Sequence, residues 1–120
     1  MRITRWLGRG VGAASVAIGV AACGGGGASP VIAVYSSFGS VQCSGGGTTL
    51  THLQQSLVAA GIQVLASRCG LDGVVRPALC GAPDGRIAIF DIDEPAAAVA
   101  LFLGFALLST LPGATHDDCP

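Results

Sequence analysis

Three acidic residues in the C-terminal half of the chain have a type and spacing that could do chemistry. Asp91 and Asp93 alternate at the end of an apolar stretch, and Glu94 follows directly. Paired carboxylates can work as general acid and base or bind Ca²⁺. However, Asp93 and Glu94 also precede Pro95, and acidic residues before a proline are typical of a helix start. We favour this capping role over catalysis or metal binding.

A glycine-rich segment is the second candidate. Residues 44–49 read Ser-Gly-Gly-Gly-Thr-Thr and precede a helical pattern, and N–H groups at a helix start can hold an anion. No lysine follows, so the segment is not a Walker-type phosphate loop. Ser36 or Ser37 with His52 could be drawn as a nucleophile and its base, but no Gly-x-Ser-x-Gly elbow is present. The sequence therefore predicts no catalytic residue and no cofactor.

Cys23 is a candidate for lipid attachment because of the residues before it. Arg2, Arg5 and Arg9 precede an uncharged run of 13 residues, 10–22. This run is shorter than the about 20 residues that span a bilayer, and the whole pattern is typical of a secretory signal. Val-Ala-Ala-Cys at 20–23 resembles the bacterial lipobox. The resemblance implies that Cys23 receives the lipid and becomes the mature N-terminus; the alternative is an ordinary secretory signal cut nearby.

The same resemblance implies a location and a division of the chain. Residues 1–22 are the expected lipoprotein signal peptide, 23–30 a glycine-rich tether, and 31–120 one small domain. The protein is then expected in the cell envelope, anchored to the membrane through its N-terminal lipid and facing the periplasm. In a Gram-negative cell, Gly24 after the cysteine would direct it to the outer membrane.

The remaining cysteines are expected to form two disulfides. They are Cys43, Cys69, Cys80 and Cys119. Four cysteines in a short exported chain are typical of a disulfide framework, while the lack of a Cys-x-x-Cys motif disfavours a zinc or thioredoxin-like site. Three connectivities can be drawn. We favour Cys69–Cys80, which would close a hairpin loop, with Cys43–Cys119, which would hold the C-terminal tail near the first strand.

Charge excludes one class of partner. All six basic residues of the chain are arginines, and three of them lie in the signal. The mature domain therefore keeps three arginines against seven acidic residues, without a basic stripe. Nucleic-acid binding needs clustered positive charge to neutralise phosphates, so we expect no nucleic-acid partner and no polybasic contact with anionic lipid.

The elements that must position these residues follow from apolar periodicity. Strands are predicted at 31–35, 62–67, 86–92 and 105–110, and helices at 50–60 and 96–103. The strand at 86–92 is apolar on both faces and is expected to lie centrally. The order β-α-β-β-α-β resembles the ferredoxin-like α/β plait, in which two helices cover one face of an antiparallel sheet. The sequence thus predicts a small α+β domain with two disulfides.

The uncovered face of such a sheet suggests a function. Two helices on one side would not hide all of Leu65, Ala88, Phe90 and Ile92, and an exposed apolar face commonly marks a partner or dimer contact. We therefore expect a lipid-anchored module that binds a protein or peptide, or a second copy of itself, through the open sheet face. The alternative is a small enzyme or an anion- or ligand-binding domain that uses the glycine-rich loop edge with Asp84 and Asp91.

Overall fold

The computed structural model describes residues 29–120. The expected signal peptide, Cys23 as the expected site of lipid attachment, and most of the expected tether lie outside the described residues. Within residues 29–120, none of the helices combines the length and the apolar character needed to cross a membrane.

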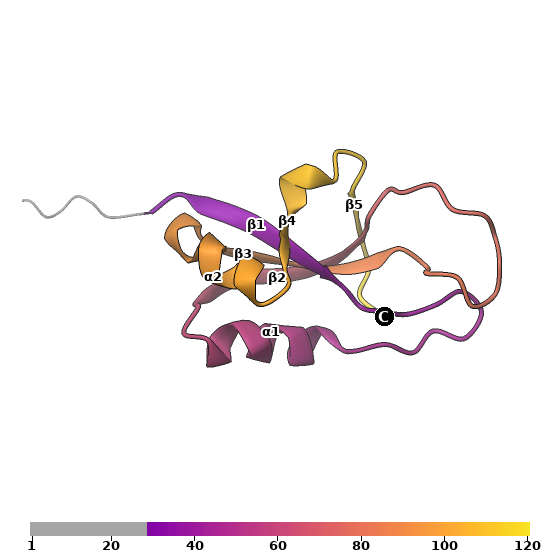
Figure 1. Ribbon diagram of the computed structural model, residues 1–120, viewed down its shortest axis with the longest axis horizontal. Coiled ribbons are helices and arrows are strands. Elements are labelled where there is room, and N and C mark those ends of the chain that lie inside the picture. The colour runs from indigo at the N-terminus through magenta and orange to yellow at the C-terminus, as the bar shows by residue number, and fades with distance from the viewer. Residues whose placement is uncertain (1–28) are drawn as a thin grey trace, which may run out of the picture.

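A five-stranded antiparallel sheet forms the centre of the fold (Figure 1). Its strands are β1 Val31–Ser37, β2 Val64–Leu71, β3 Arg86–Asp93, β4 Ala106–Leu107 and β5 Thr115–Asp117. Their order across the sheet is β4-β1-β3-β2-β5. β3 pairs along its length with both β1 and β2, so its predicted central place is confirmed. A strand that is paired at both edges and covered on both faces is buried throughout, so the side chains on both of its faces are apolar.

Two helices follow β1 and β3. α1 is Leu50–Ala59. Its N-cap is Thr49, whose Oγ1 accepts a hydrogen bond from the backbone N–H of His52 at 3.1 Å, as expected for a threonine at this position. α2 is Ala97–Phe102, and a short 3₁₀ segment, η2 Glu94–Ala96, precedes it. Gly104 ends the second helix with a φ of 101°, which an L-residue rarely adopts.

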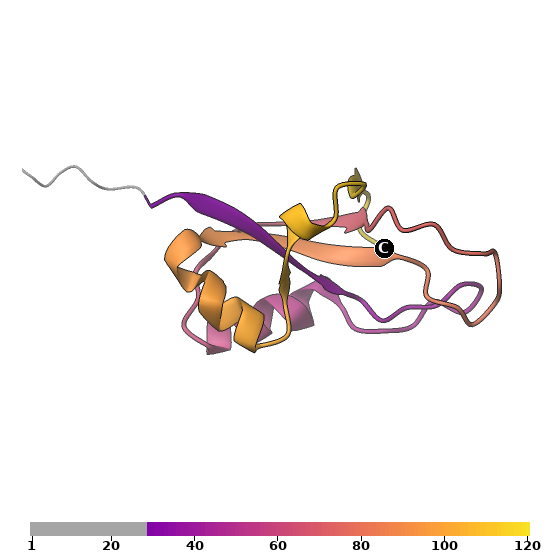
Figure 2. The same ribbon diagram turned by 45° about the horizontal axis from the view of Figure 1, so that its top comes forward.

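Both helices cover one face of the sheet (Figure 2). Leu57 of α1 and Ala100 of α2 are fully buried against Phe90 of β3. The Phe90 ring also meets Phe105 edge to face, with ring centroids 6.0 Å apart, a favourable aromatic geometry. Of the four residues that we expected two helices not to hide completely, Ala88, Phe90 and Ile92 are fully buried in this helix-covered core.

The opposite face is partly covered as well. β4 and β5 lie at opposite edges of the sheet, so the chain between them must cross it. This connection includes the 3₁₀ segment η3 Leu108–Thr110, and Figure 2 shows it on the side away from the helices. Ile87 and Ile89 point to this face and are almost completely buried. Leu65, the fourth of these residues, is 44% exposed, so the predicted open apolar face is reduced to a single side chain of this set.

Two differences at the C-terminus explain this cover. The strand expected at 105–110 is only Ala106–Leu107, because η3 turns the chain away from the sheet edge. The polar tail, for which no strand was predicted, forms β5 beside β2. Beyond the end of β1, Val41 forms isolated bridges with Gly45 and Pro83. The predicted small α+β domain with an antiparallel sheet, two helices and two disulfides is confirmed.

Candidate functional site

The two disulfides join partners other than those we favoured from the sequence. Cys43 is bonded to Cys80, with their Cα atoms 5.2 Å apart, and Cys69 to Cys119, with a Cα separation of 5.0 Å. The favoured pairs, Cys69–Cys80 and Cys43–Cys119, are therefore wrong. The reason is β5: it pairs with β2 in the register Cys69 opposite Asp117, which carries Cys119 back to Cys69. The polar composition of the tail concealed this strand.

The Cys43–Cys80 bond fixes a long loop at one end of the molecule. We name residues 72–85, between β2 and β3, the distal loop, because Figure 1 shows it at the end opposite the start of the described chain. The loop contains no helix, and its strand-like pairing is limited to an isolated bridge between Pro83 and Val41. Such a segment would ordinarily be mobile. Here three kinds of contact hold it.

The first contact is an ion pair at the base of the distal loop. Arg76 donates two hydrogen bonds to the carboxylate of Asp72, at 2.9 and 2.7 Å. The same carboxylate accepts from the backbone N–H of Val74 at 2.9 Å. The guanidinium hydrogen bond outweighs the effect of burial and lowers the pKa of Asp72. A bidentate pair of this kind fixes direction as well as charge.

The second contact is the amide of Gln42, which reaches across to the distal loop. Its Nε2 donates to the carbonyl oxygens of Pro77 and Pro83, at 3.1 and 3.2 Å. Its Oε1 accepts from the backbone N–H of Leu79 at 2.9 Å. One side chain thus satisfies three backbone groups of the loop. The third contact is the adjacent Cys43–Cys80 disulfide.

The loop held in this way presents apolar side chains to water. Val75 is 96% exposed, Leu79 62% and Val74 51%. A loop of this length without regular structure is uncommon in a compact domain and is usually either functional or disordered. The sequence did not mark these residues as a site. The signal that could have found them is an apolar segment, interrupted by Pro77, that ends directly at a cysteine.

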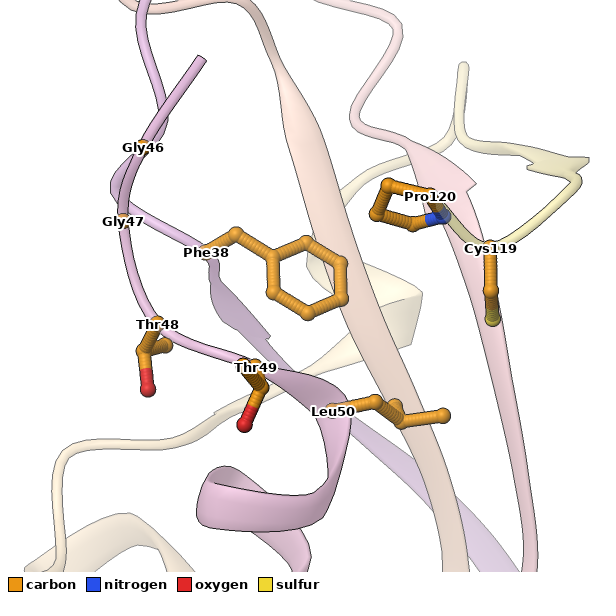
Figure 3. A pocket seen from close by; sticks show the side chains of 8 residues that line it. All are labelled: Phe38, Gly46, Gly47, Thr48, Thr49, Leu50, Cys119 and Pro120. Carbon is orange, nitrogen blue, oxygen red and sulfur yellow. The ribbon is translucent and has the colours of Figure 1, made fainter.

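A hollow of about 320 Å³ lies beside the start of α1. Its lining residues are Phe38, Gly46, Gly47, Thr48, Thr49, Leu50, Cys119 and Pro120. Figure 3 shows the Phe38 ring in the middle of this set, with Gly46 and Gly47 on one side and Pro120 on the other. The glycine-rich segment therefore lines a mostly apolar depression.

A neighbouring hollow of about 260 Å³ adds polar groups to the same region, namely Ser40, Asp84 and Arg86. Burial opposes ionisation of Asp84, but hydrogen bonds from the backbone N–H of Arg86 and from the Ser40 hydroxyl outweigh it and lower the pKa of Asp84. Among residues 29–120, the guanidinium of Arg86 makes only long ion pairs, 3.9 Å to Asp84 and 4.0 Å to Asp117.

The acidic residues singled out from the sequence have separate structural roles. Asp91 forms a 2.8 Å ion pair with Arg68 of β2. Asp93 occupies the N-cap position of η2, as predicted, but its side chain makes no capping hydrogen bond.

The structure also bears on the candidate serines and on metal binding. Ser37 Oγ accepts a hydrogen bond from the backbone N–H of Gly39. Among residues 29–120, no group of three histidine, cysteine, aspartate or glutamate side chains lies close enough together to hold a metal ion.

Similarity to known proteins adds nothing to this description of the surface. No protein-family model matches the chain, and no curated protein or solved structure matches it significantly. A function must therefore be derived from the chemistry of the surface itself. The distal loop is the candidate site that combines exposure with a fixed conformation.

Proposed function

We propose that the protein is a lipid-anchored module of the cell envelope that binds a protein or peptide partner through the distal loop. One observation carries this proposal. Val75 is 96% exposed in a loop that a disulfide, a bidentate ion pair and three hydrogen bonds with the Gln42 side chain hold in place. An apolar loop that is already ordered loses less conformational entropy on binding.

The chemistry of the loop indicates the kind of partner. Val74, Val75 and Leu79 offer apolar contacts, and the charges of Asp72 and Arg76 are paired with each other. The loop therefore fits an apolar groove or pocket on the partner rather than a charged surface. A second copy of the chain is a special case of such a partner.

The anchor and the finer fold belong to the same proposal. A lipid on Cys23 would hold the domain at the membrane, facing the periplasm, with the distal loop at the far end from the tether. The folded part is a ferredoxin-like plait extended by β5. The antiparallel order β4-β1-β3-β2, with α1 between β1 and β2 and α2 between β3 and β4, supports this assignment.

The partner proposal is tested by crosslinking from the distal loop. A photo-reactive amino acid replaces Val75 in one variant and Val58, an apolar residue of α1 that is 54% exposed, in the control. We expect a discrete adduct on whole cells from position 75 alone, and a mass of two chains identifies a second copy. An equal yield from both positions, or none from position 75, refutes the proposal.

The anchor is tested separately. Cys23→Ala is expected to release the protein from the membrane fraction, and mass spectrometry of the mature N-terminus is expected to show an acylated cysteine in the natural chain. A Cys23→Ala protein that fractionates like the natural one removes the anchor but leaves the partner proposal in place.

Binding of a small anion with an apolar group is a second candidate function. The specific observation in its favour is that Arg86, with only long ion pairs, faces the polar hollow next to Phe38. Titration calorimetry with benzoate and with inorganic phosphate is the test. Heat of binding that is seen with the natural protein and is lost in Arg86→Gln supports this function. Absence of binding heat with the natural protein as well as with Arg86→Gln refutes it.

A further inference from the structure

The second apolar surface of the molecule is the exposed side of α2. Phe102 is 90% exposed, and Val99, Leu101 and Leu103 are each 40–45% exposed. Only Ala100 of this helix is fully buried, against the sheet. A phenylalanine at the surface beside three large aliphatic residues is more than the scattered apolar exposure of ordinary protein surfaces.

This surface is also free of charge over a long stretch. Residues 95–115 contain no aspartate, glutamate, arginine, lysine or histidine. α1, on the same face of the sheet, has His52 as its only titratable side chain. The charged residues of the described chain lie instead in β2, β3 and β5, in the distal loop, at Glu94, which begins η2, and at Asp118, directly after β5. An uncharged helical face suits a low-dielectric environment, because no ion has to be desolvated there.

The start of the described chain lies beside this helix. The backbone N–H of Glu94 donates to the carbonyl of Pro30 at 2.8 Å. Ser29 lines one hollow together with Pro95 and Ala96, the residues that lead into α2. Figure 1 likewise shows α2 in the half of the molecule where the described chain begins. The helix itself rises only about 7.5 Å from Ala97 to Phe102.

The tether length limits how far this end can be from the anchor. Six Cα steps separate Cys23 from Ser29, and an extended chain covers at most about 3.5 Å per step. Ser29 therefore lies within about 21 Å of a lipid-bearing Cys23. At this distance the local concentration of membrane is high, so a weak contact becomes productive.

We propose that α2 is a membrane-contact helix, which inserts Phe102 and its aliphatic neighbours into the lipid–water interface next to the anchor. The proposal rests on the lipid anchor of the proposed function and adds an orientation to it. With α2 on the bilayer, the distal loop projects away from the membrane towards a partner. Because no basic residue takes part, the contact is driven by apolar burial and is insensitive to salt.

Tryptophan fluorescence tests the contact directly. The only tryptophan of the chain, Trp6, lies in the expected signal peptide, so each variant of the mature protein carries one introduced probe. We compare Phe102→Trp with Val75→Trp, a similarly exposed position at the far end. Both lipid-modified proteins are reconstituted into vesicles of phosphatidylcholine that carries bromine on its acyl chains, which quenches only tryptophan in contact with lipid.

The expected result is quenching of Phe102→Trp that is severalfold stronger than that of Val75→Trp, and equal at low and high salt. Interfacial helices place their apolar face about 5–10 Å into the headgroup and acyl boundary. A blue-shifted Phe102→Trp emission without quenching shows a protein contact instead and overturns the proposal. Equal quenching of the two probes overturns it too.

A second measurement separates this inference from the anchor. Mature Cys23→Ala protein is added to vesicles, and Phe102→Ala in that background is expected to lower the partition constant about tenfold, since burial of a phenylalanine side chain is worth at least that factor. Leu79→Ala, which changes an exposed residue of the distal loop, is expected to leave it unchanged. Absence of quenching of Phe102→Trp in lipidated protein would exclude the α2 contact and leave the anchor in place. A tenfold effect of Phe102→Ala in the Cys23→Ala background would support the α2 contact even if the separate test of the anchor failed.

Discussion

Replacement of Cys43 by alanine is the sharpest test of the disulfide framework. Cys43 is bonded to Cys80 in the structure, so Cys43→Ala must leave the thiol of Cys80 free. With the pairing that we favoured from the sequence, the liberated thiol would be that of Cys119. The two outcomes differ by one peptide in a digest, because a thiol reagent added without reductant labels only the unpaired cysteine.

The energetic consequence can be worked from the separations in sequence. Cys43–Cys80 spans 37 residues and Cys69–Cys119 spans 50. The chain-entropy model then gives stabilisation of about 3.8 and about 4.1 kcal/mol. A domain of this size has a total free energy of unfolding of about 5–14 kcal/mol. Each bond therefore supplies a large part of the stability of the domain.

The two bonds differ in what surrounds them. Cys69 is 3% exposed and belongs to the core, whereas Cys43 and Cys80 are exposed in loops. Loss of Cys69–Cys119 in the double alanine variant also removes a buried sulfur, which adds about 1 kcal/mol. It releases β5 from β2 as well. We expect this variant to lose more stability in urea than the Cys43→Ala, Cys80→Ala variant.

Two results would refute this reasoning. Labelling of Cys119 in Cys43→Ala would show that the pairing is wrong. A Cys43→Ala, Cys80→Ala protein that is less stable than the Cys69→Ala, Cys119→Ala protein would show that the distal loop, rather than the core bond, limits unfolding. In the second case the loop would be part of the cooperative fold and not a separately braced binding element.

Three further predictions concern the core, the ion pair and the glycine-rich segment. Phe90→Ala is expected to lower the free energy of unfolding by about 3–5 kcal/mol, because Phe90 is fully buried; a loss under about 1 kcal/mol in urea denaturation would contradict the described core. The pKa of Asp72 is lowered in the fold by its hydrogen bond from Arg76, so its contribution is present above the unfolded pKa of about 3.9 and disappears as the pH falls through the lower folded value. Asp72→Asn should therefore weaken the acid dependence of stability, and an unchanged pH profile would count against the pair. Gly47→Ala is expected to cost at least about 1 kcal/mol more than Gly46→Ala, because both glycines have positive φ but only at Gly47 would a Cβ collide with backbone; equal melting temperatures would show that the segment adapts.

The elements of the fold could be predicted from the sequence where local signals were strong. The apolar alternation of β3, the Thr49 cap of α1 and the glycine after α2 each depend on chemistry within a few residues. The packing of these elements against one another was harder to predict from the sequence. The complete burial of Ala88 and Phe90 was not predicted, because periodicity shows which residues share a face but not which face the helices cover.

The candidate site was missed for a related reason. Gln42 and Leu79 are 37 residues apart and meet only because the loops before α1 and after β2 end at the same edge of the fold. A contact between residues so far apart in the chain produces no periodic pattern in the sequence. The same holds for Cys69 and Cys119, which β5 brings together through three residues of polar strand. The number of disulfides could be predicted from composition, whereas their pairing required the topology.

The distribution of apolar residues explains why so small a domain needs both bonds. Within residues 29–120, eleven large hydrophobic side chains are exposed, against twelve buried hydrophobic residues, two of them alanines. The core is correspondingly limited, and a small domain has little surplus of burial over conformational entropy. A hydrophobic core too small to stabilise the fold by itself is supplemented by disulfide bonds. Most of these exposed residues lie in two places, in the distal loop around Val75 and in or directly after α2 around Phe102. If these residues had no binding role, replacing them by polar residues would raise solubility without loss of partner or membrane binding. If they have the proposed roles, replacements in the distal loop remove the partner contact alone, and replacements in α2 remove the membrane contact alone.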